Sequence, residues 1–206
     1  MHPLWSCVFG NPQPVEVEIG PGTGTFILAA AETRPPSNFF GVEHSRSRAT
    51  RLQAAIESHR LRNARVIHAD AACVVASLIP SASVAAYHIY FPDPWWKRRH
   101  HRRRLFTPTF AQALARTLMA GGRVFVATDV DDVLRLVRTT LQSSGLFALD
   151  HEVSPLQGAV TAFERKGLAR GATIKRATFV KRAAPHTRPA AHPSKAAPMT
   201  PAESPS

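Results

Sequence analysis

The sequence has little cysteine and no long apolar run, and each shortage excludes a class of protein. Its two cysteines, Cys7 and Cys73, are too few for a disulfide framework and lack the C-x-x-C spacing of a zinc site. Residues 1–10 contain no apolar core of a secretory signal, and no uninterrupted apolar stretch is long enough to span a bilayer. We therefore expect a cytoplasmic protein that is not inserted in a membrane and has no metal site.

Acidic residues are also scarce. The chain has 14 Asp and Glu residues against 26 Lys and Arg residues, which gives a formal net charge of +12. A field of this sign and size attracts polyanions, so nucleic acid is the first candidate partner. The alternative is a basic surface that only keeps the protein in solution.

The length and composition predict one folded domain with a tail. A chain of 206 residues that is 44% hydrophobic can bury one substantial core. We divide it into a short N-terminal segment (1–14), the folded domain (15–182) and a tail (183–206) rich in Pro and Ala. The tail has few large apolar residues and is predicted to be disordered. The sequence leaves the oligomeric state open, with a monomer as the expectation.

Strand and helix patterns alternate along the domain. β-branched or alternating apolar runs predict strands at 15–19, 38–42, 64–67, 84–91 and 122–127. Apolar residues at helical spacing follow them at 26–31, 52–59, 109–119 and 133–141. This alternation predicts an α/β fold with a doubly wound, mostly parallel sheet. Such sheets bind ligands outside the carboxyl ends of their strands, so residues that directly follow a strand are the candidate site residues.

A glycine-rich turn follows the first predicted strand. Gly20, Gly22 and Gly24 form a G-x-G-x-G pattern, and glycine lets a backbone approach a nucleoside-bearing ligand closely. A dinucleotide fingerprint would need its third glycine at position 25, which is Thr25. The turn is therefore not typical of NAD binding, although it could also serve only to pack the first helix closely.

Acidic residues also lie at or just after the carboxyl ends of predicted strands, as the glycine turn does. Glu43 ends the second strand about twenty residues on, where a carboxylate can accept from both ribose hydroxyls of a nucleoside. Glu18 lies beside the turn and suits the cationic amino-acid end of S-adenosyl-L-methionine, and Asp70 could accept from its adenine amine. Each acid alone could be an ordinary surface carboxylate. Together they predict an S-adenosyl-L-methionine site.

A rigid aromatic turn and a cationic run follow the fourth strand. In Phe91-Pro92-Asp93-Pro94-Trp95, two prolines flank Asp93, and Lys97 to Arg104 bring lysine, histidine and arginine side chains. Cationic side chains can bind the phosphate oxygens of a nucleic acid, and its bases can stack on aromatic side chains. We predict phosphate contacts by three residues of this run, Arg102, Arg103 and Arg104.

The chain resembles the bacterial tRNA (guanine-N7)-methyltransferases, which modify a guanine in the tRNA variable loop. The resemblance spans about Val15 to Lys181 and rests on Glu18 to Gly24, Gly41 to Glu43, Asp70, Phe91 to Trp95 with Lys97, Arg99-His100, Arg103-Arg104, Thr128-Asp129 and Thr161 to Glu164. It implies the class I methyltransferase (Rossmann-like) sheet, which commonly has seven strands with one antiparallel edge strand. Residues 147–149 and 159–163 are then the candidates for the last strands.

The resemblance also implies roles for single residues. The cofactor S-adenosyl-L-methionine would contact Glu18, Glu43, Asp70 and Asp93, together with the turn glycines, and Asp93 would be the catalytic residue. The tRNA would be bound by Lys97, Asp129, Thr161 and Glu164.

The chemistry of guanine narrows the role of Asp93. N7 has a free lone pair, so no general base is needed before it attacks a methyl group. The methylated purine is cationic, and a nearby carboxylate would stabilise that charge or hold the guanine by accepting from N1–H and N2–H. We therefore expect Asp93 to position the base and to act as a counter-charge; the alternative is a structural cap on the following turn.

Two other functions remain open from the residues alone. One is a methyltransferase of the same fold that acts on a small molecule or a protein, against which stands the arginine run beside Asp93. The other is an RNA-binding protein that has lost activity, against which stand Glu43, Asp70, Asp93 and Lys97.

Overall fold

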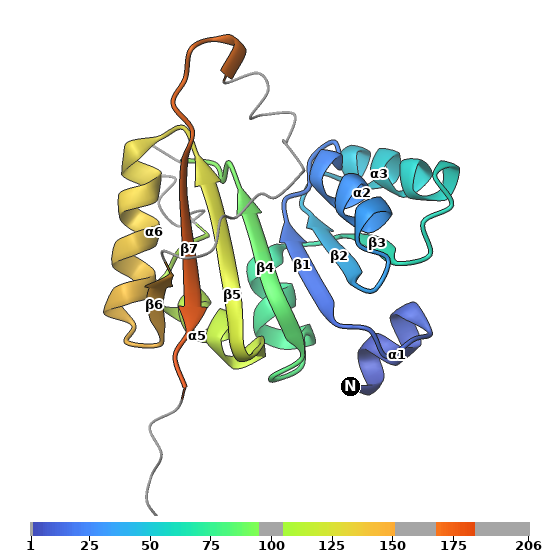
Figure 1. Cartoon of the computed structure of the whole chain (residues 1–206), viewed down its shortest axis with the longest axis horizontal. Helices are drawn as coiled ribbons and strands as arrows, with labels where there is room; N and C mark the ends of the chain where they lie inside the picture. The colour runs from blue at the N-terminus through green and yellow to red at the C-terminus, as the bar shows by residue number, and fades with distance from the viewer. Residues whose placement is uncertain (1, 95–104, 151–167, 184–206) are drawn as a thin grey trace, which may run out of the picture.

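A computed structural model describes residues 2–94, 105–150 and 168–183 of the chain. In these ranges a seven-stranded sheet is flanked by helices on both faces (Figure 1). The strands are β1 (Val15–Ile19), β2 (Asn38–Glu43), β3 (Ala64–His68), β4 (Val84–Tyr90), β5 (Leu118–Thr128), β6 (Phe147–Asp150) and β7 (Lys175–Lys181). The helices are α1 (Pro3–Phe9), α2 (Thr25–Thr33), α3 (Arg46–Ser58), α4 (Ala71–Cys73) with the π-helical turn η1 (Val74–Leu78), α5 (Pro108–Thr117) and α6 (Asp131–Ser143).

The strand order is β3-β2-β1-β4-β5-β7-β6. The first five strands of this order pair in parallel, and β7 pairs antiparallel with both β5 and β6. The chain runs outward from β1 to β3 and then returns to place β4 on the other side of β1. The crevice for a ligand is therefore expected between the carboxyl ends of β1 and β4.

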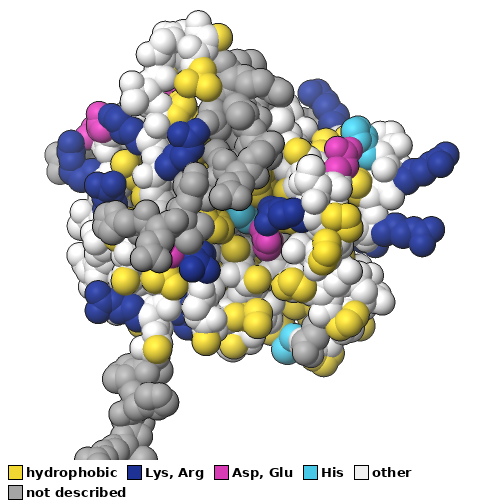
Figure 2. Space-filling model, in the orientation of Figure 1, with side chains coloured by type: hydrophobic (Ala, Val, Ile, Leu, Met, Phe, Trp, Pro, Cys, Tyr) yellow, Lys and Arg dark blue, Asp and Glu magenta, His cyan; other side chains and the backbone are white. Residues whose placement is uncertain are grey.

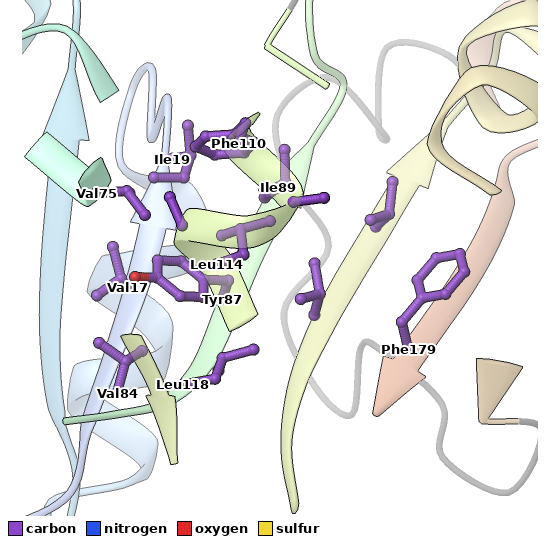
Figure 3. Packing of buried hydrophobic residues seen from close by; sticks show 14 of the residues in the cluster. Val17, Ile19, Val75, Val84, Tyr87, Ile89, Phe110, Leu114, Leu118 and Phe179 are labelled. Carbon is purple, nitrogen blue, oxygen red and sulfur yellow. The ribbon is translucent and has the colours of Figure 1, made fainter. Parts of the chain in front are cut away.

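Two hydrophobic clusters fill the two faces of the sheet. The larger one joins the face of β1 that carries Val17 to residues of α5 and α6, and Figure 3 shows Tyr87, Leu114 and Leu118 packed in it. The smaller one joins α2 and α3 to the opposite face through Phe26, Leu52 and their neighbours. No helix in the described ranges combines the length and apolar character needed to cross a bilayer.

The doubly wound, mostly parallel α/β sheet is the predicted fold, and the predicted strands match β1 to β5 within a few residues. The antiparallel strand, however, does not lie at the edge, because β7 stands between β5 and β6. The predicted strand at 147–149 is β6, whereas 159–163 lies outside the described residues. The seventh strand of the described sheet is instead Lys175–Lys181, whose centre, Ala177 to Phe179, is buried, while cationic residues stand at both of its ends.

The segment 1–14, for which no helix was predicted, contains α1. Pro3 opens this helix and Gly10 ends it in the left-handed conformation, as is typical of helix termini. Trp5 and Phe9 of α1 are buried in the larger cluster, where Trp5 packs edge-on against Phe40 of β2. All of the predicted tail (183–206) except Ala183 lies outside the described residues, so the division into three parts stays a prediction.

Candidate active site

The sheet brings five predicted positions to one edge. Because β1 to β5 are parallel, the residues at their carboxyl ends meet there. They are Glu18 with the glycine turn after β1, Glu43 at the end of β2, Asp70 after β3, Asp93 after β4 and Asp129 after β5.

The glycine turn needs glycine for its backbone. Gly20, Gly22 and Gly24 have φ angles of 69°, 59° and 82°, in the left-handed region that other residues rarely adopt. The turn is held by the N–H of Gly20, which donates to the Val42 carbonyl (2.9 Å), and by the N–H of Gly24, which donates to Pro21 (2.8 Å). A Cβ at Gly20 would meet no atom within 4 Å, so the turn faces open space there.

Gly24 has a second constraint, because a Cβ there would overlap Cδ1 of the buried Leu52. We expect Gly24→Ala to lower the free energy of unfolding by about 1 to 3 kcal/mol more than Gly121→Ala does. Gly121 also has a left-handed φ of 69°, but a Cβ there would meet nothing within 4 Å, so the control isolates the overlap from the backbone strain. Urea unfolding measures both; equal losses would show that Leu52 moves aside freely.

Glu43 is buried and ties the turn to the end of β2. Its Oε2 accepts from the Gly22 N–H (2.9 Å) and its Oε1 from the Ser45 N–H (2.8 Å). Each carboxylate oxygen can accept a second hydrogen bond. Glu43 therefore shapes the turn and keeps acceptor capacity for the hydroxyls of a bound ribose.

Glu18 is the most perturbed acid of the site. It is 5% exposed, and its Oε2 has no hydrogen-bond partner within the described residues. Burial, with a smaller contribution from the charge of Glu43, raises the pKa of Glu18 to about 8, although the Ile27 backbone N–H acts in the opposite direction. A buried carboxyl with one unpartnered oxygen fits a cationic ligand group, such as the ammonium of S-adenosyl-L-methionine.

A network of polar side chains joins Arg34, at the end of α2, to one face of β1 and β4. Arg34 donates to Glu16 (2.8 Å), and Glu16 lies 2.7 Å from His88 Nε2, while His88 Nδ1 lies 2.8 Å from the Tyr90 hydroxyl. Burial lowers the pKa of His88, so the ring is neutral at pH 7. An ionised Glu16 can only accept, which places the ring proton on Nε2 and makes the Tyr90 hydroxyl donate to Nδ1.

This hydrogen-bonded network reaches the candidate site through both β1 and β4. His88 is the register partner of Glu18, and Tyr90 directly precedes the Phe91 turn. Glu16 stays ionised because its pKa is lowered: burial acts to raise it, but the His88 ring and the Arg34 guanidinium outweigh burial. His88 and Tyr90 were not predicted as site residues, because their only signal in the sequence is polar atoms within an apolar strand.

The other three acids are exposed at the edge. Asp70 caps α4, and its Oδ1 accepts from the Cys73 N–H (2.9 Å). Asp93 and Asp129 are exposed after β4 and β5. Phe91, two residues before Asp93, has a φ of 50°, and such strained residues concentrate at functional sites. Lys97, Arg102, Arg103, Arg104, Thr161 and Glu164 lie outside the described residues.

Solved structures of other methyltransferases share this fold. The 16S rRNA methyltransferase KamB is 16% identical, with a TM-score of 0.63 over 86% of this chain and 92% of KamB. TrmN from Thermus thermophilus is 22% identical, with a TM-score of 0.58 over 87% of this chain and 47% of TrmN. At these identities the likeness concerns the fold, which is that of the class I methyltransferases.

Sequence comparison is more specific. The family model described as "Putative methyltransferase" matches residues 12–177. The tRNA (guanine-N(7)-)-methyltransferase of Nitrosomonas europaea is 36% identical over 85% of this chain and 80% of its own length. That of Paenarthrobacter aurescens is 41% identical over 74% of this chain and 52% of its own length. The chain is thus an enzyme that uses S-adenosyl-L-methionine, and it belongs to the tRNA (guanine-N(7)-)-methyltransferase family.

Proposed function

We propose that this enzyme methylates N7 of a guanine in the variable loop of tRNA, working in the cytoplasm as a monomer. The cofactor site is supported above all by Glu18, a buried carboxyl whose Oε2 has no partner within the described residues. It lies beside a turn with three glycines in the left-handed conformation. The names of the related proteins support tRNA as the substrate and N7 as the atom modified.

The residues present fit S-adenosyl-L-methionine. Glu18 would hold its ammonium, Glu43 its ribose hydroxyls and Asp70 its adenine amine, while the glycine turn leaves room for close approach at Gly20. When bound, S-adenosyl-L-methionine supplies a methyl group on a positively charged sulfur. The exposed Asp70 keeps one oxygen free, since only its Oδ1 caps α4.

Asp93 is the residue proposed to act on the guanine. It follows β4 directly, next to the crevice between β1 and β4, and its exposure leaves it accessible to a base that enters from solvent. The neighbouring prolines limit the movement of its backbone. A carboxylate here would hold the guanine and offset the positive charge that develops on it. Asp129, exposed after β5, would lie at the same edge of the sheet and contact the RNA. Lys97, Arg102, Arg103, Arg104, Thr161 and Glu164 are proposed as further tRNA-binding residues on the basis of the sequence.

A methylation assay tests this function. We expect purified protein, S-adenosyl-L-methionine and unmodified tRNA to yield 7-methylguanosine, and borohydride with aniline should then cleave the tRNA in its variable loop. A tRNA that carries 7-deazaguanine at that position is the matched control, because it lacks only the N7 nucleophile and should stay unmethylated. Methylation of another nucleoside, or of the 7-deaza tRNA, would contradict the N7 assignment.

A further inference from the structure

Helix α3 has three exposed arginines that the proposed site does not use. The segment 44–68, which contains α3 and β3, has six arginines and a single acid, Glu57. Arg46, Arg48 and Arg51, the α3 arginines, are all exposed. Arg48 and Arg51, three residues apart, are neighbours on one side of the helix, whereas Arg46 projects from another side of its first turn. Within the described part of the chain, no hydrogen bond or ion pair engages their guanidinium groups, whereas Glu57 accepts from Gln53. Figure 2 shows Lys and Arg side chains that project from this flank of the molecule.

The order of charges along α3 is the reverse of the one that stabilises a helix. The positive end of a helix dipole is its N-terminus, where acidic residues are favourable and cations are not. The first turn of α3 contains Arg46 and Arg48 and no acid, and Glu57 lies at its last turn. In contrast, α6 begins with Asp131 and Asp132. Arg46 and Arg48 therefore do not serve the stability of their helix, and a bound anion would remove the repulsion.

The α3 arginines begin at the edge of the sheet that carries the candidate site. Arg46 lies three residues after Glu43, which ends β2. From there the 13 residues of α3 extend over about 20 Å. A polyanion whose reacting group lies at the site can therefore continue along this helix.

We propose that Arg46, Arg48 and Arg51 bind phosphates of the tRNA backbone away from the methylated guanine. This inference rests on the proposed function. The guanidinium group of arginine can donate two parallel hydrogen bonds to the oxygens of one phosphate. Exposed arginines that form no ion pair keep their N–H donors free for such contacts. A protein or membrane partner would also need apolar contact, but the exposed large apolar residues in the described ranges are Leu4, Leu78, Met119, Leu146 and Leu168, none of them on α3.

A pair of double variants tests the proposal. Arg48→Gln/Arg51→Gln removes two cations three residues apart on α3, and Arg135→Gln/Arg138→Gln removes two with the same spacing from exposed positions of α6. Both lose the same net charge. We expect the α3 variant to bind tRNA roughly tenfold more weakly, and its slope of log K against log salt to be shallower by about 1.4 to 1.8. The α6 variant should bind as the wild type does.

Thermal unfolding separates binding from structure. Because the cation at position 48 opposes the dipole of α3, its removal should leave the melting temperature equal or higher, which a merely structural arginine would not do. Equal tRNA affinity and salt slope in the α3 and α6 variants would overturn the proposal. A second result would also overturn it: the wild type binds phosphatidylserine vesicles, and the α3 variant loses this binding but keeps the wild-type affinity for tRNA. Binding is measured without methylation, so absence of 7-methylguanosine with wild-type protein would contradict the proposed function alone.

Discussion

Asp93→Asn is expected to lower the rate of tRNA methylation by about 10²- to 10³-fold at saturating substrates. The amide is nearly the same size as the carboxylate but carries no negative charge to offset the cationic product. It also presents an N–H₂ group where the guanine N1–H and N2–H need acceptors. The fold should be unchanged because Asp93 is exposed and takes no part in either hydrophobic cluster.

The matched control is Asp132→Asn, an equal change at an exposed acid in the first turn of α6, which follows β5 and not the β4 strand that carries Asp93. Single-turnover methylation with pre-bound tRNA measures the chemical step for both variants. The control should react at the wild-type rate. A wild-type rate for Asp93→Asn would show that this acid neither holds the guanine nor stabilises its charge.

Glu18→Gln should weaken S-adenosyl-L-methionine binding by roughly tenfold to hundredfold, because the charge-assisted hydrogen bond to the ammonium is lost. The wild type carries a further signature. Its Glu18 pKa of about 8 means that the carboxyl is mostly protonated at pH 7, whereas the ammonium requires the ionised form. Binding at pH 7 should thus release close to one proton, and the affinity should rise with pH up to about 8. Calorimetry in two buffers of different ionisation enthalpy counts this proton.

When no cofactor is bound, Glu18→Gln should raise the free energy of unfolding. In the unfolded chain Glu18 has a pKa near 4.5, so between pH 4.5 and 8 the folded state binds more protons and stability falls as pH rises. Glutamine has no such dependence. The gain in unfolding free energy should therefore grow from pH 5 to pH 8, where it approaches about 4 kcal/mol. A gain that does not change with pH, or calorimetry without proton release, would contradict the buried neutral state of Glu18.

The class of fold could be predicted from the sequence alone, and so could the candidate site positions at the carboxyl ends of the strands. Runs such as Val84 to Tyr90 are apolar and β-branched or aromatic, and they alternate with helical spacing, so local pattern was sufficient to predict β1 to β5. Because parallel strands share an edge, acids such as Glu43 and Asp93 could be assigned to one site from their place after a strand. The family resemblance rests on the same residues, and the related proteins confirm it.

Other features depend on contacts between distant parts of the chain. Lys175–Lys181 has cations at three of its seven positions and is a strand because β5 and β6 flank it. The pKa of Glu18 follows from its burial at the junction of β1 and α2, which no local pattern of charges reveals. The order of charges on α3 could be read from the sequence, but only the tertiary structure showed that its arginines are exposed, unpaired and at the edge of the site. Burial and ion pairing are set by what packs opposite a residue, and that is decided by the folded chain as a whole.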